Sequence, residues 1–206
     1  MKRVVILADG EFPVHETPLS ILKQSEYLVC CDGAAKKCIE YGYNPDAIVG
    51  NMDSLDDEFK SRYKSIIHQS DCQETNDLTK SVEFVTANSP SEIVILGATG
   101  KREDHTLGNI SLLMEYHLKH NIPIRMYSDY GVFIPLTSTS TLNCRPNSQV
   151  SIFALTPESK LDSIGLKYPI DNVKFDSWWK GTLNESLADR FTISFNSGRI
   201  IIFIGY

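Results

Sequence analysis

The chain has 206 residues and a formal net charge of −6, and its 42% hydrophobic and 22% charged residues are typical of a globular protein with one large or two small domains. The acidic balance argues against a nucleic-acid partner, and no apolar run approaches the ~20 residues that span a bilayer, so we expect no membrane partner. The five cysteines include no CxxC pair, and the first apolar run is too short for a signal peptide, which together predict a cytoplasmic protein with reduced thiols and no zinc site.

The first part of the chain alternates between apolar, β-branched runs and helix-forming segments. We expect strands at residues 3–8, 27–31, 47–49, 65–68, 92–96 and 124–127. We expect helices at residues 19–24, 34–41 and 56–63, and two more that each have an apolar face. These faces consist of Leu78, Val82 and Val85 in one helix, and of Leu107, Ile110, Met114 and Leu118 in the other. The alternation predicts an α/β domain with a doubly wound, mostly parallel sheet at residues 1–128.

Beyond this point the pattern changes to short β-prone segments separated by Pro, Asn, Gly and Ser. They cover residues 130–135, 139–144, 149–155, 190–195 and 199–204. Because no helical period of any length appears, we expect a small all-β sandwich or barrel domain at residues 129–206. In a strand, the adjacent Trp178 and Trp179 would point to opposite faces, which would place one of them in the core.

Four aspartates of the first domain follow predicted strands or begin predicted helices. They are Asp32, Asp53, Asp77 and Asp104. Turns after parallel strands emerge at one edge of the sheet, so these carboxylates can converge there. Without compensation they would repel one another and raise one another's pKa values, and such a cluster is typical of a Mg²⁺ site. Lys80, Lys101 and Arg102 are then placed to meet phosphate oxygens.

Each aspartate alone also has a structural explanation, as a helix cap or a turn residue. Asp104, for example, would be the N-cap of its helix, with Lys101 and Arg102 solvated. The joint pattern favours a nucleotide and metal site instead. The sequence contains no GxxxxGK[ST], GxGxxG, HExxH or GxSxG motif, which excludes the two best-known nucleotide-binding loops and weakens a hydrolase interpretation.

The acidic turns form a series that resembles the motifs of the thiamine pyrophosphokinase family, in their order and separation. The segments Asp32-Gly-Ala-Ala, Gly50-Asn-Met-Asp-Ser54, Gln73 to Lys80 and Gly97 to Asn109 correspond to DGGA, GDxDS, QxxTDxxK and GxxGGRxDHxLxN. In the second half, Gly165-Leu-Lys-Tyr-Pro-Ile170 and Gly181-Thr-Leu-Asn-Glu185 are similar to the family's GLKYPL and SNE stretches. The resemblance therefore extends over nearly the whole chain.

The resemblance implies a Mg²⁺-dependent transferase that moves pyrophosphate from ATP to the hydroxyl of thiamine, giving thiamine diphosphate and AMP. It implies an ATP-binding catalytic first domain, a thiamine-binding β domain, and a homodimer with its sites at the subunit interface. By similarity, the catalytic residues are Asp53, Asp77 and Asp104, with either Asp77 or Asp104 as the general base. The implied metal ligands are Asp53, Asp77, Asp32 and Asn51. The implied ATP contacts are Asp32, Gln73, Lys80, Arg102, His105 and Asn109, where His105 either braces the turn or acts chemically. The implied thiamine contacts are Tyr168, Asn184 and Glu185, although Tyr168 is equally explained by packing within the β domain.

The chain departs from the family pattern at four positions. Asn51 replaces an Asp, Asn76 a Thr, Lys101 a Gly and Leu183 a Ser. The first change leaves the metal stoichiometry open, and the last leaves one thiamine contact open. Two alternatives to the enzyme therefore remain: a thiamine or nucleotide binder that has lost the chemistry, and a transferase that acts on another small alcohol.

Overall fold

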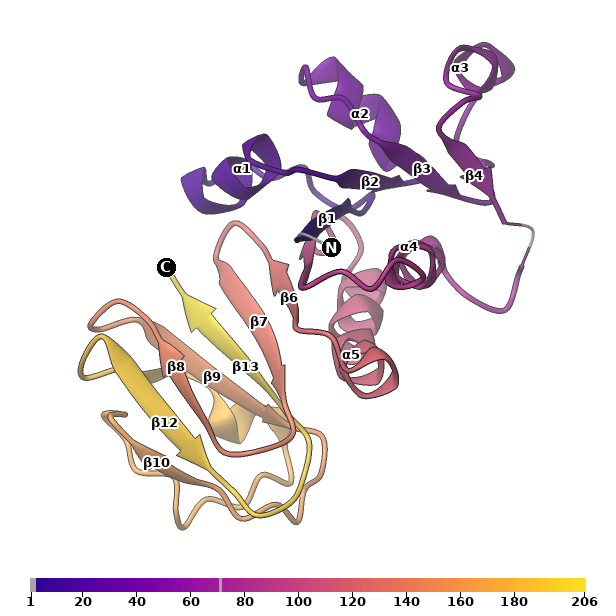
Figure 1. Cartoon of the computed structure of the whole chain (residues 1–206). Coiled ribbons are helices and arrows are strands. Elements are labelled where there is room, and N and C mark those ends of the chain that lie inside the picture. The colour runs from indigo at the N-terminus through magenta and orange to yellow at the C-terminus, as the bar shows by residue number, and fades with distance from the viewer. Residues whose placement is uncertain (1–2, 71) are drawn as a thin grey trace. The chain divides into compact units, whose positions relative to one another are not determined.

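The computed structural model describes residues 3–70 and 72–206, and the chain divides into two compact units, Met1–Asp129 and Tyr130–Tyr206 (Figure 1). The strands of unit 1 are β1 (Val4–Leu7), β2 (Leu28–Cys31), β3 (Ala47–Gly50), β4 (Ile67–Gln69), β5 (Ile93–Leu96) and β6 (Ile124–Tyr127). They pair in parallel, in the order β6-β5-β1-β2-β3-β4. The predicted α/β fold with a mostly parallel sheet is confirmed.

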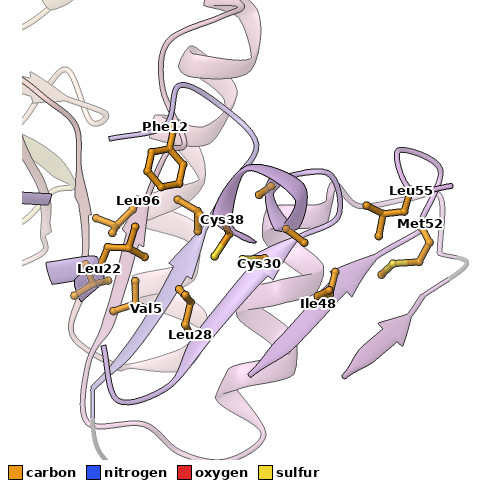
Figure 2. Close-up of a cluster of buried hydrophobic side chains, with 14 residues drawn as sticks. Val5, Phe12, Leu22, Leu28, Cys30, Cys38, Ile48, Met52, Leu55 and Leu96 are labelled. Atoms are coloured by element: carbon orange, nitrogen blue, oxygen red, sulfur yellow. The ribbon is translucent and has the colours of Figure 1, made fainter. Parts of the chain in front are cut away.

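Five helices connect these strands. They are α1 (Glu16–Lys23), α2 (Ala34–Glu40), α3 (Asp57–Arg62), α4 (Asp77–Thr86) and α5 (Glu103–His120). Every residue of β1, β2, β3 and β5 is buried, as expected for parallel strands that are covered on both faces. One face carries the core shown in Figure 2, where Val5, Leu28, Cys30 and Ile48 of the strands meet Leu22 and other side chains of α1, α2 and the adjoining turns. On α4 the predicted apolar face is buried, and this helix contacts β1, β2 and β3.

Two helices differ from the prediction. Helix α1 begins earlier than expected because His15 caps it by accepting a hydrogen bond from the backbone of Thr17, and Pro18 is tolerated in its first turn. The predicted apolar face of α5 is only partly right: Met114 is buried and Ile110 partly buried, but the other buried residues are Leu113 and Tyr116. Leu107 and Leu118 are 54% and 47% exposed, because packing against α4 and β6 buries a neighbouring stripe of the helix.

Gly108 lies inside α5, and a Cβ atom added there would meet no atom within 4 Å. We expect Gly108→Ala to raise the free energy of unfolding by about 0.5–1 kcal/mol, because alanine loses less backbone entropy when a helix forms. Urea denaturation monitored by circular dichroism would measure the change. A destabilised variant would contradict the open space that the structure places around this position.

Unit 2 contains two antiparallel sheets. Its strands are β7 (Gly131–Leu136), β8 (Ser140–Asn143), β9 (Gln149–Ala154), β10 (Asp162–Ile164), β11 (Asn184–Glu185), β12 (Arg190–Ser194) and β13 (Ile200–Gly205). The first sheet has the order β11-β9-β13-β7 and the second the order β10-β12-β8. Alternate residues of both sheets, such as Ile152, Ile202, Phe191 and Ile193, share one apolar core. The expected all-β sandwich is therefore present.

The interpretation of the adjacent tryptophans is wrong. Trp178 and Trp179 begin a short 3₁₀ helix, η1 (Trp178–Gly181), and are 45% and 72% exposed. Because neither lies in a strand, the alternation of faces does not apply, and Trp178 instead packs edge-on against Phe153 with ring centroids 5.9 Å apart. Among the described residues, no helix combines the length and apolar character needed to cross a bilayer.

Candidate functional site

A cleft of about 520 Å³ lies in unit 1 where the turns after several strands meet. The sheet order changes direction between β1 and β5, since the chain runs outward from β1 to β4 and then returns to β5 on the other side. Ligands of open α/β sheets bind at such a switch point. The cleft is lined by Ala8, Asp9, Gly10, Cys31, Asp32, Gly33, Ser54, Asn76, Asp77, Leu78, Ala98, Gly100, Lys101, Arg102, Asp104, His105, Gly108 and Asn109. Three of the four aspartates singled out from the sequence are therefore in one lining.

Asp32 and Asp77 both lie against Gly50, the last residue of β3. A Cβ atom added to this glycine would lie 2.8 Å from Cβ of Asp32 and 3.1 Å from Cγ of Asp77. Asp32 is only 4% exposed, and its Oδ1 atom has no hydrogen-bond partner among the described residues. Burial raises the pKa of Asp32 above its ordinary value, hydrogen bonds from Ser54 oppose this, and the charges of Asp77 and Asp53 raise it further. The ionised pair is therefore held at an energetic cost that a bound cation would offset.

Asp77 also pairs with a buried cation. Asp77 is the first residue of α4, which Asn76 caps by accepting a hydrogen bond from the backbone of Thr79. Lys80 lies one turn further on; its side chain is 6% exposed, and its Nζ donates to Oδ1 of Asp77 over 3.0 Å. Lys80 is outside the cleft lining, so in this arrangement it orients Asp77.

Asn51 and Asp53 lie in the turn after β3, beside the cleft and outside its lining. Nδ2 of Asn51 donates to Oδ2 of Asp53 over 2.8 Å, and the backbone N–H of Asp53 donates to Oδ1 of Asn51 over 3.2 Å. The charge of Asp53 nevertheless acts on Asp32. Gln73 is exposed and does not contribute to the lining either.

The turn between β5 and α5 carries two cations, and both are paired. Arg102 donates from Nε and Nη2 to the two carboxylate oxygens of Asp104, over 3.0 and 2.5 Å. These hydrogen bonds lower the pKa of Asp104 to about 2. Arg102, not Asp104, is the N-cap residue of α5, and Lys101 forms an ion pair with Asp9. Asp104 is therefore not the N-cap, and the two cations are ion-paired although their side chains remain exposed to solvent.

His105 and Asn109 face the same cleft from the first turns of α5. The backbone N–H of His105 donates to Oδ1 of Asp104 over 3.0 Å. Nδ2 of Asn109 donates to the carbonyl oxygen of Ala98 over 2.8 Å, which ties the helix to the turn before it.

Asp9 is the lining acid that the sequence analysis did not single out. It comes two residues after the end of β1 and precedes Gly10, much as Asp32 follows β2 and precedes Gly33. This repeated strand–Asp–Gly pattern was the signal that could have identified it. Its carboxylate lies beside Gly33, with Oδ2 at 2.9 Å from the position of an added Cβ atom.

The three predicted thiamine contacts lie close together in unit 2. Oδ1 of Asn184 accepts a hydrogen bond from the backbone of Tyr168 over 3.1 Å, and Nδ2 of Asn184 donates to the carbonyl oxygen of Tyr168 over 2.8 Å. Glu185 pairs with Lys167 at 3.2 Å, and the ammonium of Lys167 also lies 5.7 Å from the centre of the Tyr168 ring. The side chain of Tyr168 is 55% exposed, and its ring already has the ammonium of Lys167 beside it.

The donor set at Gly50 fits Mg²⁺. In the part of the chain that the structure describes, no three His, Cys, Asp or Glu side chains are arranged to hold a metal ion between them. Mg²⁺ is usually bound through one or two carboxylates, with water and substrate phosphates completing its shell. Asp32, with its buried and unpartnered Oδ1, and Asp77 provide carboxylates of this kind.

Comparison with known proteins gives one consistent result. The chain matches the family model of the thiamin pyrophosphokinase catalytic domain over residues 19–126, and that of the thiamin pyrophosphokinase substrate-binding domain over residues 131–203. It is 31% identical over 175 residues to thiamine pyrophosphokinase 1 of Oryza sativa, covering 70% of this chain and 65% of the rice protein. It is 26% identical over 214 residues to thiamine pyrophosphokinase of Bacillus subtilis, covering 98% of each chain.

Solved structures agree in fold. The crystal structure of the Bacillus subtilis thiamine pyrophosphokinase matches with a TM-score of 0.82 at 24% identity and covers 98% of both chains. That of thiamin pyrophosphokinase from Candida albicans has a TM-score of 0.82 at 20% identity and covers 99% of this chain and 88% of the other. The chain spans 65% and 66% of the length of two rice relatives, but nearly all of the Bacillus protein. Both halves of the sequence thus match one family, and the chain belongs to the thiamin pyrophosphokinase family.

Proposed function

We propose that this chain is a Mg²⁺-dependent thiamine pyrophosphokinase, which transfers pyrophosphate from ATP to thiamine. The observation that carries the proposal is the approach of Asp32 and Asp77 to each other beside the backbone of Gly50, inside a cleft at the switch point of the sheet. Two buried or half-buried acids with an unpartnered oxygen are suited to a divalent cation and an anionic nucleotide. Membership of the family supplies the identity of the second substrate.

In this proposal the nucleotide occupies the cleft of unit 1. Asp77, Asp32 and Asp53 would hold the Mg²⁺, with Asn51 beside Asp53, and the bound ion would neutralise charge on the triphosphate. The triphosphate contacts come from Arg102, with Gln73, Lys80, His105 and Asn109 completing the ATP site. Arg102 is suited to this role because its guanidinium forms paired hydrogen bonds with oxyanions.

The reaction is a displacement at phosphorus. The hydroxyl oxygen of thiamine attacks the β-phosphorus of ATP, the bond from that phosphorus to the oxygen of the α-phosphate breaks, and AMP leaves. The protein contributes by holding the two oxygens in line and by neutralising charge. The hydroxyl proton passes to a carboxylate. The candidates are Asp77 and Asp104, and each is paired with a cation here: Lys80 donates to Asp77, and Arg102 lowers the pKa of Asp104 to about 2.

Thiamine is assigned to unit 2, where Tyr168, Asn184 and Glu185 are joined by hydrogen bonds. An aromatic ring and a carboxylate suit the positively charged thiazolium. The ammonium of Lys167 lies against both groups, which is consistent with a site that attracts cations. We further propose a cytoplasmic homodimer whose active sites are completed at the subunit interface.

A product assay tests the proposal directly. The purified protein is incubated with ATP, Mg²⁺ and thiamine, and mass spectrometry should detect thiamine diphosphate and AMP in equal amounts. Binding of both substrates without AMP release would identify a non-catalytic binder. AMP release with another small alcohol, but not with thiamine, would identify a different acceptor, and either result would reject the proposed reaction.

Restoring an acid at position 51 tests the assignment of the metal ligands. Asn51→Asp places a second carboxylate against Asp53, whose Oδ2 now accepts a hydrogen bond from Asn51 over 2.8 Å. The added charge should attract Mg²⁺ more strongly, and we expect the Mg²⁺ concentration for half-maximal rate to fall about fivefold, the equivalent of about 1 kcal/mol. Titration of AMP release with MgCl₂ would measure it.

Asn172→Asp is the matched control, because Asn172 makes the same type of contact with Asp171, over 2.7 Å, in unit 2 and outside the cleft. We expect its Mg²⁺ requirement to equal that of the wild type. An unchanged or increased requirement in Asn51→Asp would place position 51 away from the metal.

A further inference from the structure

Lys101 adopts a backbone conformation that favours glycine. It lies in the turn between β5 and α5 with a φ of 55°, next to Gly100 with a φ of 77°. A side chain in the left-handed region strains the backbone, whereas glycine adopts that conformation freely. A lysine at this position therefore acts against local stability, which points to a role for its side chain.

The ammonium of Lys101 is anchored on Asp9. Its Nζ donates to the carbonyl oxygen and to Oδ1 of Asp9, over 2.8 Å in each case. The two turns are already joined through their backbones, by hydrogen bonds from Gly10 to Gly97 over 2.6 Å and from Glu11 to Thr99 over 2.9 Å. The ion pair is thus not needed to connect them, and it is about half-exposed.

Both partners line the cleft of unit 1. An ammonium has three N–H donors, and in the described part of the chain two of those of Lys101 are used, both on Asp9. The third donor is available to an anionic ligand in the cleft. Without Lys101, the carboxylate of Asp9 would be an uncompensated negative charge on the cleft wall. The charge of Asp9 already reaches the thiol of Cys31, because it helps to raise the pKa of that thiol.

We propose that Asp9 is a positioning residue that holds Lys101 on the cleft wall as a cation for the triphosphate, so that the Asp9–Lys101 pair determines the affinity for ATP. This inference rests on the proposed function, since it assumes that the cleft binds ATP. It adds Asp9 to the site and gives a physical reason for a lysine at a strained position.

The test compares ATP binding with thermal stability. ATP dissociation constants in the presence of Mg²⁺ are measured by isothermal titration calorimetry, without thiamine, for the wild type, Lys101→Met and Lys101→Gly. A hydrogen bond to a charged group is lost in both variants, so we expect the dissociation constant to increase about ten- to hundredfold. The melting temperature of Lys101→Gly should not fall, because glycine relieves the strained backbone.

Two further variants separate the effect of the Lys101 charge from the effect of a positive-φ backbone. Lys101→Arg keeps the cation and should restore most of the affinity. Ser89→Gly is the matched control for the backbone, because Ser89 also has a positive φ, 48°, in an exposed turn outside the cleft. We expect it to bind ATP like the wild type.

The contribution of Asp9 is measured by a double-mutant cycle. If Asp9 acts through Lys101, Asp9→Asn alone should weaken ATP binding, and Lys101→Met should weaken it several-fold less in the Asp9→Asn background than in the wild type, because Lys101 is then no longer held on the cleft wall by the carboxylate. Additive effects would overturn the role of Asp9.

The remaining outcomes separate a failure of this inference from a failure of the proposed function. Wild-type affinity in Lys101→Met, with ATP binding to the wild type intact, would overturn this inference alone and leave the proposed function standing. A wild-type protein that binds no ATP would overturn both. If Lys101→Gly lost affinity together with melting temperature, the lysine would be maintaining the turn, and its assignment as a phosphate-binding cation would be rejected.

Discussion

Asp77→Asn is expected to lower kcat for AMP release by about 100-fold or more while the protein stays folded. The change removes one of the two carboxylates that lie against Gly50 but keeps the size of the side chain. The remaining amide oxygen can still accept the hydrogen bond from Nζ of Lys80, so the local shape is retained. Electrostatic stabilisation of a transferred phosphoryl group contributes several kcal/mol, and about 2.7 kcal/mol corresponds to a factor of about 100 in rate.

Asp57→Asn is the matched control for this experiment. Asp57 is the first residue of α3, as Asp77 is of α4, so the substitution removes the same charge from the same helical position outside the cleft. Its kcat should remain that of the wild type. Circular dichroism must show that both variants are folded at the assay temperature, and near-normal turnover by Asp77→Asn would refute a catalytic role.

Much of the fold followed from local pattern. The runs that became β1, β2, β3 and β5 are short, apolar and β-branched, because a parallel strand covered on both faces has no solvent-facing side to carry polar residues. In unit 2, β9 and β12 alternate instead, as β9 does with Val150, Ile152 and Ala154 buried, whereas β13 is an almost continuous apolar run. The shortness of these segments and the turn residues between them, more than alternation, indicated the antiparallel sheets.

The elements that the sequence did not reveal depend on tertiary contacts. Strands β10 and β11 have three and two residues, too few for any period to be recognised. The buried stripe of α5 is selected by its neighbours: Tyr116 is drawn inward by packing and by a 2.6 Å hydrogen bond between its hydroxyl and that of Thr79 on α4. Helical spacing alone identifies residues that share a face, but it does not say which face meets the protein.

For the candidate site, the sequence predicted which side chains meet at one edge of the sheet better than it predicted which of them form ion pairs. Parallel-sheet geometry was sufficient to bring Asp32, Asp77 and Asp104 to one edge. The spacing of Asp77 and Lys80, three residues apart on a helix, also indicates their ion pair. The pairing of Lys101 with Asp9, 92 residues away, depends on how two turns approach each other, and no local pattern encodes that.

Gly50→Ala should impair the proposed reaction by a different route, because it removes none of the proposed ligands. Gly50 ends β3 and does not have a positive φ, so alanine can adopt its backbone conformation. The new Cβ atom, however, would lie 2.8 Å from Cβ of Asp32 and 3.2 Å from Oδ1 of Asp77, and both carboxylates would have to move. Overpacking of this kind costs about 1–3 kcal/mol of stability. Because catalysis depends on position to within an ångström, we also expect kcat to fall about 100-fold.

The comparison with Gly205→Ala isolates this effect. Gly205 ends β13 in unit 2, and its added Cβ atom would be 3.4 Å from the nearest atom, an ordinary van der Waals contact. Urea denaturation and the AMP-release assay on both variants should show losses of stability and turnover in Gly50→Ala alone. If Gly50→Ala lost stability but kept its kcat, the two carboxylates could shift without consequence for the reaction. Their approach beside Gly50 would then have no part in catalysis, and the metal and phosphate chemistry would have to be assigned to other acids of the cleft.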